Sequence, residues 1–172
     1  MNNSDPKSIR DALEKAQDAF QERGRGRPSY EDGIEQGGGW ETQITKACRL
    51  IEVADVIREQ DGYHTAVIEL CFGAIERSIE GYAVGMTEGE VEAFGDHEYS
   101  YRRAHETGLF GQKTAERMEE LYNENRTESY YGGGRPTDTQ ADSMHELARE
   151  VHSFAVEQIQ DSGVCICDAR KE

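Results

Sequence analysis

The sequence lacks a long uninterrupted hydrophobic run. Its most apolar stretch, TAVIELCFGAIERSI at residues 65–79, is broken by Glu69 and Glu76. A membrane-spanning helix needs about 20 predominantly apolar residues, and a secretory signal needs a continuous apolar segment. The polar N-terminus, MNNSDPKSIRDALEK, has neither property. We therefore expect a soluble, cytoplasmic protein that does not enter a membrane.

Basic side chains are scarce relative to acidic ones. The 172 residues include 19 Lys and Arg against 35 Asp and Glu, for a formal net charge of −16. In ordinary buffer this charge argues against general nucleic-acid binding, which needs a basic surface. The acidic surface either serves solubility alone or suits a cytosol of high salt, where the Debye length falls to about 3 Å at 1 M. We favour the halophilic interpretation, because an acidic, strongly hydrated surface keeps a protein in solution at high salt. In such a cytosol the repulsion is screened, so a local group of arginines can still bind phosphate.

Metal-binding patterns are missing too. Cys165 and Cys167 are separated by one residue, whereas zinc-binding pairs are usually separated by roughly two to four, and no second pair completes a site. His145 and His152 are seven residues apart, about 10 Å along a helix, which is too far to share one ion within a chain. We expect neither a metal nor a cofactor.

Strand-type alternation and internal repeats are absent, whereas helical spacing of apolar residues recurs along the chain. The first helical pattern ends at Gly24, and a loop with six glycines in sixteen residues follows at 24–39. This loop lacks the strand and the Lys-Ser/Thr pair of a phosphate-binding loop. Its composition predicts flexibility, so residues 1–39 are interpreted as an accessory or partner-binding arm.

The rest of the chain predicts helices joined by short connectors. They lie at residues 40–60, 63–84, within 97–108, from about Ala115 to Arg126, and from Thr137 or Asp138 to Ile159. Thr87 and Asp96 are suited to cap the shorter helices. We predict an all-α fold, an antiparallel four- or five-helix bundle over residues 40–162, with residues 163–172 as a tail.

The apolar faces of these helices are rich in Ala and Cys and poor in Leu. Cys48 and Cys71 both occupy apolar positions of helical patterns, where thiols usually behave as small hydrophobic side chains. A core built from such small residues is thin, and association of two copies would bury more of it. This favours a homodimer.

The segment HEYSYRRAH at 97–105 combines histidine, tyrosine and arginine. Arginine forks bind phosphate and tyrosine faces stack on bases, so Arg102 and His105 are candidate substrate-binding residues. The acidic neighbours Asp96 and Glu98 would equally pair with the arginines on a solvated helix face. We favour the solvated face on the sequence alone.

The connector NENRTESYYGGG at 123–134 holds Arg126 and Tyr131 five residues apart. Spacing alone favours helix-end chemistry, with Asn125 or Arg126 satisfying the last carbonyls, the tyrosines covering the core and the glycines turning the chain. A binding role for Arg126 needs further support.

That support comes from a resemblance. Residues 40–160 resemble the HEPN superfamily of small helical-bundle proteins. The likeness consists of a helix, Gly108-Leu109, a helix with ALxxL-like apolar spacing, Arg126-x4-Tyr131 followed by glycine, and a long final helix. Residues 1–39 would be an addition to such a domain.

The resemblance implies a specific site. Many HEPN proteins dimerise so that two Arg-x4–6-His motifs face each other and cleave RNA without a metal, the arginine holding the phosphate and the histidine acting as acid or base. Arg126 matches the first position, but residues 131, 132 and 133 are Tyr, Gly and Gly. Thr127 stands where active members prefer Asn, Asp or His. The motif histidine is therefore missing.

The resemblance also implies what a tyrosine in this motif does. A phenol titrates at about pH 10 against about 6.5 for imidazole, so Tyr131 is a poor general base although it can donate to phosphate. Some tyrosine-type HEPN proteins are non-nucleolytic partners of minimal nucleotidyltransferases, and related ones are nucleotidylated on a nearby tyrosine. Tyr130 and Tyr131 are thus candidate acceptors as well as ligands.

Together these observations predict a homodimeric component of a toxin–antitoxin-like or defence system. It would bind RNA or a nucleotide at a dimer cleft through Arg126 and Tyr131, with weak or absent cleavage. A conditional, metal-independent ribonuclease, a non-catalytic module that binds a partner such as a minimal nucleotidyltransferase, and a purely structural bundle stay open as alternatives.

Overall fold

The computed structural model describes residues 6–21, 29–31, 34, 39–87, 97–127 and 132–159. Within these residues the chain forms six helices and no strand: α1 (Lys7–Phe20), α2 (Trp40–Arg58), α3 (His64–Thr87), α4 (His97–Glu106), α5 (Gln112–Glu124) and α6 (Asp138–Gln158). Its contacts divide the chain into two compact units, Met1–Asp32 and Gly33–Glu172. The prediction of an all-α helical bundle is confirmed.

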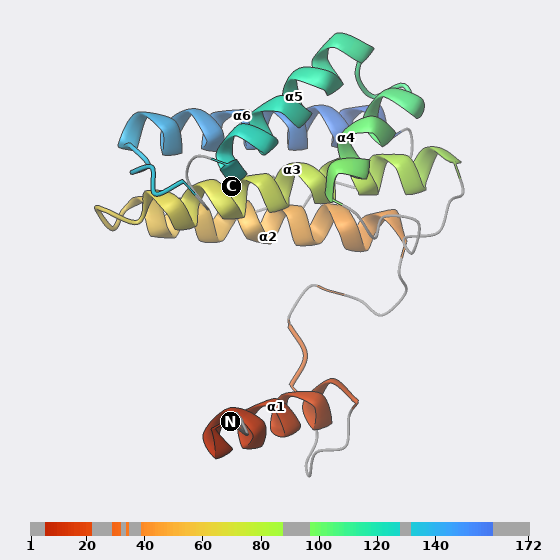
Figure 1. Ribbon diagram of the computed structural model, residues 1–172. Coiled ribbons are helices and arrows are strands. Elements are labelled where there is room, and N and C mark those ends of the chain that lie inside the picture. The colour runs from red at the N-terminus through yellow and green to blue at the C-terminus, as the bar shows by residue number, and fades with distance from the viewer. Residues whose placement is uncertain are drawn as a thin grey trace. The chain divides into compact units, whose positions relative to one another are not determined.

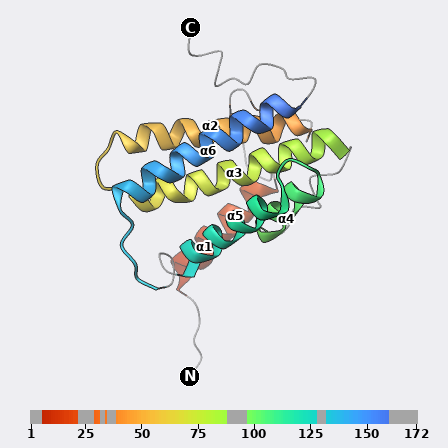
Figure 2. The ribbon, with the colours of Figure 1, turned by 90° about the horizontal axis from the view of Figure 1, so that it is seen from above.

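Three long helices of the second unit, α2, α3 and α6, lie side by side (Figures 1 and 2). Arg58 at the end of α2 pairs with Asp142 near the start of α6. Ser78 in the second half of α3 bonds His152 in the second half of α6. Therefore α6 runs antiparallel to α2 and parallel to α3.

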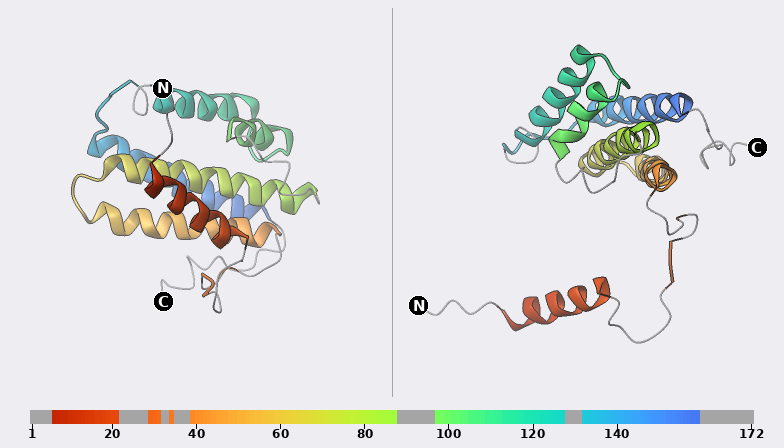
Figure 3. Two further views of the ribbon diagram at one scale, coloured as in Figure 1. Left: turned by 60° about the horizontal axis from the view of Figure 1, so that its bottom comes forward. Right: turned by 90° about the vertical axis from the view of Figure 1, so that its right-hand side faces the viewer.

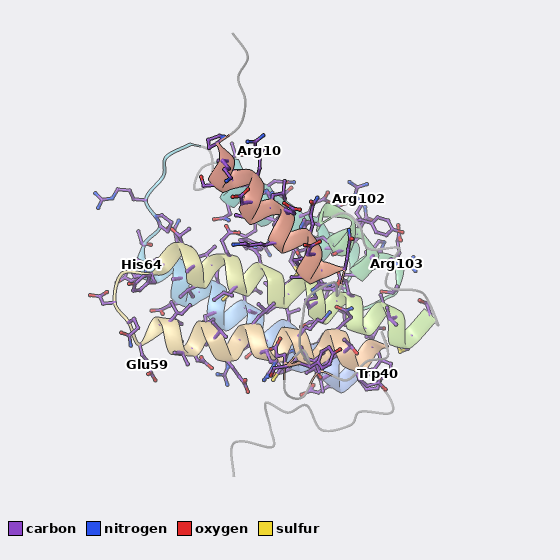
Figure 4. The ribbon with its side chains drawn as sticks, turned by 90° about the horizontal axis from the view of Figure 1, so that it is seen from below. Arg10, Trp40, Glu59, His64, Arg102 and Arg103 are labelled. Carbon is purple, nitrogen blue, oxygen red and sulfur yellow. The ribbon has the colours of Figure 1, made fainter. Side chains whose placement is uncertain are left out.

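A tight turn joins α2 to α3. Gly62 in this turn has φ of +91°, a left-handed conformation that glycine adopts without the steric penalty of a side chain. Figure 4 shows Glu59 and His64 at the same end of the helix pair, and Trp40 at the other end of α2. This hairpin provides the surface on which α4 and α6 pack.

The two shorter helices form a hairpin beside the three-helix layer (Figure 3). Helix α4 packs against α3, and α5 packs against α4. Gly108, with φ of +83°, makes the turn between them. At the end of α5, Asn125 Nδ2 donates to Glu69 Oε1 near the start of α3 at 3.3 Å. Helix α5 thus returns the chain to the N-terminal end of α3, where α6 begins, and this crossover explains why α6 is parallel to α3.

Alanine and cysteine take many of the core positions, between larger side chains such as Ile75, Ile79 and Tyr101. Fully buried positions include Ala47, Cys48, Ala54, Cys71, Ala74, Ala104, Ala148 and Ala155. Cys71 is a free thiol, and burial raises its pKa to about 12, so it behaves as the small hydrophobic residue predicted. Cys48 differs from that expectation because it is disulfide-bonded. Cys165 and Cys167 lie outside the described residues.

The helix boundaries agree with the capping signal at the start of α6. Thr137 caps α6 through a capping box. The backbone N–H of Gln140 donates to Thr137 Oγ1, and the backbone N–H of Thr137 donates to Gln140 Oε1. Thr87 is the last residue of α3, and its hydroxyl donates to the Ala83 carbonyl at 2.6 Å. The residues that follow it, 88–96, lie outside the described residues, so its capping of a shorter helix stays a prediction. The predicted cap Asp96 lies outside the described residues.

No helix in the described part of the chain is both long enough and apolar enough to cross a lipid bilayer.

Candidate functional site

Tyr122 on α5 is the centre of an aromatic group where α3, α4 and α5 meet. Its side chain is 7% exposed. The Phe72 ring meets it edge-on at 5.4 Å between centroids, and the Tyr101 ring lies 5.5 Å away. The His97 ring stacks against it at 6.3 Å. Rings from two other helices therefore fix the position of Tyr122.

Arg126 follows Tyr122 by one helical turn, so the two side chains share a face. One guanidinium nitrogen, Nη1, donates to Tyr122 Oη at 2.9 Å, and Cζ lies 5.3 Å from the ring centroid. This geometry combines a hydrogen bond with a cation–π contact. Residues 125–127 form a wider, π-helical turn directly after α5. Arg126, the residue predicted to bind phosphate, is thus half-buried, and its guanidinium is held by Tyr122, whose own position is fixed by packing.

His97 begins α4 and is paired with a buried carboxylate. Its Nδ1 lies 2.6 Å from Glu76 Oε2, while its side chain is 67% exposed. The Tyr101 hydroxyl donates to the other oxygen of Glu76 at 3.3 Å. With Glu76 ionised, Nδ1 carries the proton that the carboxylate accepts, so in the neutral form of the ring Nε2 is the nitrogen with the lone pair. The Glu76–His97 pair therefore orients an imidazole at the surface.

Burial shapes the titration of this group. Desolvation raises the pKa of Glu76, and the hydrogen bond from His97 opposes that rise. Glu80, one turn further along α3, also has a raised pKa because it is buried, while its ion pair with Arg77 at 2.8 Å opposes the rise. Desolvation and the neighbouring Glu76 charge raise the pKa of Tyr101, so its hydroxyl stays protonated and remains a donor.

The other predicted site residues are placed elsewhere or are not described. Asn125 is next to Arg126 and bonds Glu69. Arg102 on α4 pairs with Glu119 on α5 at 3.5 Å. Glu119 precedes Arg126 by seven residues, a rise of about 10 Å along a helix, so Arg102 is not beside Arg126. His105 is exposed, with Nδ1 3.4 Å from the Phe110 carbonyl oxygen. Arg102 and His105 thus belong to a solvated helix face, as the charge pattern favoured.

Tyr130 and Tyr131 lie outside the described residues, so their contacts with Arg126 stay a prediction. Sequence reasoning missed Glu76, His97 and Tyr122. Glu76 was counted only as an interruption of the apolar run, although a carboxylate inside such a run signals a buried polar partner. The four-residue spacing of Tyr122 and Arg126 was visible as a same-face pair.

A partly open pocket of about 500 Å³ lies between α3, α5 and α6. Its walls are mainly apolar, formed by Ile68, Phe72, Leu121, Met144 and Leu147. Phe72 also contacts Tyr122. The pocket is therefore adjacent to the aromatic group that holds Arg126.

A second polar group links α2 to α6. Arg58 Nη1 lies 3.0 Å from His145 Nδ1, and His145 Nε2 lies 2.6 Å from Asp55 Oδ1, although the N–H does not point at that oxygen. Burial and the Arg58 charge lower the pKa of His145. A guanidinium facing Nδ1 requires that nitrogen to accept, so His145 is neutral and its role here is to join two helices.

Within the part of the chain that the structure describes, no group of three or more His, Cys, Asp or Glu side chains is arranged to hold a metal ion.

The structure is therefore that of an all-α bundle in which one buried tyrosine, Tyr122, contacts both Arg126 and His97, and His97 is paired with the carboxylate of Glu76. The chain belongs to the family described as a domain of unknown function, DUF8154, whose model matches residues 4–167. No curated protein and no solved structure matches the chain.

Proposed function

We propose that this protein is a HEPN-like component of a toxin–antitoxin-like or defence system that binds the phosphate of a nucleotide or RNA through Arg126. The observation that carries the proposal is the fixation of the Arg126 guanidinium by both the hydroxyl and the ring of Tyr122. A guanidinium has five N–H donors, so a bond to Tyr122 is compatible with a bidentate contact to phosphate.

One neighbouring side chain, His97, supports the same interpretation. The His97 ring, on α4, stacks against the same Tyr122 ring that Arg126 contacts. A protonated imidazole there is a second cation beside Arg126. Arginine forks bind phosphate in a geometry that lysine does not reproduce. In molar salt the overall charge of −16 is screened, while a half-buried bidentate contact is screened less.

A homodimer is part of this proposal. The many alanine and cysteine positions of the core and the paired motif of the HEPN resemblance both favour two chains with their Arg126 residues at a shared cleft. Light scattering in molar KCl should give about twice the 19.4 kDa chain mass. A monomer at micromolar concentration would contradict the shared cleft.

The binding test compares two arginines, Arg126 just after α5 and Arg117 within α5. Wild-type protein should bind a short RNA or a nucleotide in molar KCl, and Arg126→Ala should reduce the affinity at least tenfold with unchanged circular dichroism. Arg117→Ala removes an exposed arginine from the same helix and should leave affinity unchanged. Equal effects of the two substitutions would show that Arg126 is only a helix-end residue.

The Glu76–His97 pair favours a second candidate function, a metal-independent ribonuclease. An imidazole oriented by a carboxylate is a common general base, and it would supply the proton transfer that Tyr131 performs poorly. RNA cleavage that persists in EDTA and is lost in His97→Ala would favour this function. Absence of turnover alongside Arg126-dependent binding would favour the binding function.

A non-catalytic partner of a minimal nucleotidyltransferase remains the third alternative, in which Tyr130 or Tyr131 would accept a nucleotidyl group. A small nucleotidyltransferase encoded by the adjacent gene would favour it. Incubation with that enzyme and ATP should then add a nucleotidyl mass that Tyr130→Phe or Tyr131→Phe removes. An unchanged mass would reject this alternative.

A further inference from the structure

The pocket beside Tyr122 has a size and lining suited to one small organic group. Its volume of about 500 Å³ falls within the range of roughly 300–1,000 Å³ typical of ligand sites. The apolar walls described above meet a polar rim that includes Glu124, Asn125, Gln140 and Ser143. An apolar slot with amide, hydroxyl and carboxylate groups at its rim matches the flat faces and polar edges of a nucleobase.

The pocket and the arginine site are neighbours in the chain and share one wall residue. Leu121 on α5 and Asn125 directly after it line the pocket, and they directly precede Tyr122 and Arg126 of the arginine site. Phe72 on α3 forms part of the pocket wall and also contacts the Tyr122 ring. Arg126 is thus placed beside the pocket, as a partner for a phosphate attached to a base that occupies it.

We propose that this pocket binds the nucleobase of the ligand whose phosphate contacts Arg126. The base packs against the apolar wall, whose more exposed side chains are Leu121 and Leu147. The rim groups bond its edge: Glu124 accepts from ring or exocyclic N–H groups, while Asn125 both donates and accepts. The proposal rests on the proposed function, and it adds that base and phosphate are recognised together, as in a free nucleotide or a single-stranded RNA residue.

The test compares ligands that separate base from phosphate. Calorimetric titrations in molar KCl would use inorganic phosphate, the four 5′-nucleoside monophosphates, their nucleosides and the oligonucleotide A5. The best monophosphate should bind at least tenfold more tightly than inorganic phosphate. Similar affinity for A5 and AMP would identify free nucleotide as sufficient, and tighter binding of A5 would identify RNA as the source.

Two tryptophan variants on α6 distinguish the pocket from the general surface. Ser143 is exposed and lines the pocket, so Ser143→Trp fills it without altering the core. Glu146→Trp places the same side chain three residues further along the helix at an exposed position outside that lining. Ser143→Trp should weaken binding of the best monophosphate at least tenfold and leave phosphate binding unchanged, whereas Glu146→Trp should change neither.

The outcomes separate the two proposals. If phosphate and all four monophosphates bind equally, through Arg126, the base pocket is rejected and the phosphate site stands. Unchanged nucleotide binding in Ser143→Trp would also reject the pocket. If no phosphate-bearing probe binds, or if Arg126→Ala has no effect on binding, both proposals are wrong.

Discussion

Tyr122 serves the core and the candidate site through different parts of one side chain. Its buried ring packs against Phe72 and Tyr101, and its hydroxyl accepts from Arg126. Removing the ring would disturb folding and binding together. Arg126 is only half-buried and follows the last residue of α5 by two positions, so it can be changed with little effect on the core. For this reason the functional tests use Arg126.

The environment of His145 predicts how the free energy of unfolding depends on pH. Burial and Arg58 lower its pKa, so the folded chain takes up a proton less readily than the unfolded chain, whose histidine pKa is about 6.5. The free energy of unfolding should therefore decrease as the pH falls from 7 to 5. His145→Gln, which does not titrate, should show a smaller decrease in urea unfolding at the two pH values.

The comparison needs a control because other groups act in the opposite direction. Glu76 and Glu80 have raised pKa values, so they bind protons more readily in the folded state and favour it as the pH falls. Glu76 and Glu80 are present in both the wild type and His145→Gln, so their contributions cancel in the difference between the two pH dependences. The exposed His105→Gln variant should keep the wild-type slope. A wild-type slope in His145→Gln would contradict the account.

Of the four residues of the candidate site, Arg126, Tyr122, His97 and Glu76, the sequence singled out only Arg126, because its motif is local. The sequence also favoured a solvated face for Arg102, but its acidic partner is Glu119 on α5 rather than a neighbour in the chain. The contact between His97 and Glu76 joins residues 21 positions apart on different helices. Local patterns cannot specify such a contact, because it depends on how α4 packs on α3.

At the scale of the elements, close approach of α2 and α3 depends on glycine. A Cβ built on Gly81 would lie 2.8 Å from Cδ1 and Cγ1 of the buried Ile44 and 3.3 Å from the Trp40 carbonyl oxygen. On Gly73 it would lie 3.2 Å from Cδ1 of Leu50, the flexible end of a partly buried side chain. The two glycines therefore differ in how much room a methyl group has.

Alanine substitution at these glycines tests the packing. Alanine favours a helix over glycine by about 1 kcal/mol, and overpacking a core costs about 1–3 kcal/mol. Gly81→Ala should therefore lower the free energy of unfolding by about 1 kcal/mol, whereas Gly73→Ala should leave it unchanged or raise it. Urea unfolding in molar KCl would measure both. Stabilisation by Gly81→Ala would show that α2 and α3 do not pack this closely.

The helices themselves were largely predictable, because each has an apolar period and α6 has a capping box. The end of α3 at Thr87 was not predictable. A threonine can cap the start of a helix, and it can equally lie within a helix and donate its hydroxyl to the carbonyl four residues earlier. The parallel direction of α6 and α3 was also beyond the sequence. It follows from the α5 crossover, which no local pattern specifies.

For the whole molecule, the charge of −16 predicts a dependence on salt. Unscreened acidic side chains repel one another and destabilise the compact state, and salt weakens that repulsion. The unfolding temperature should rise steeply between low and molar KCl, as measured by circular dichroism. A flat profile would reject the halophilic interpretation and restore the electrostatic objection to binding RNA.

The central claim is that Arg126 binds phosphate. The most direct measurement is a titration with inorganic phosphate followed by NMR of the arginine Nε–Hε signals in molar KCl, with the Arg126 signal assigned from Arg126→Lys. The account predicts a saturable shift of the Arg126 signal and no comparable shift of the Arg117 signal, which the Arg117→Lys variant would assign. An unmoved Arg126 signal, or equal shifts of both, would contradict it.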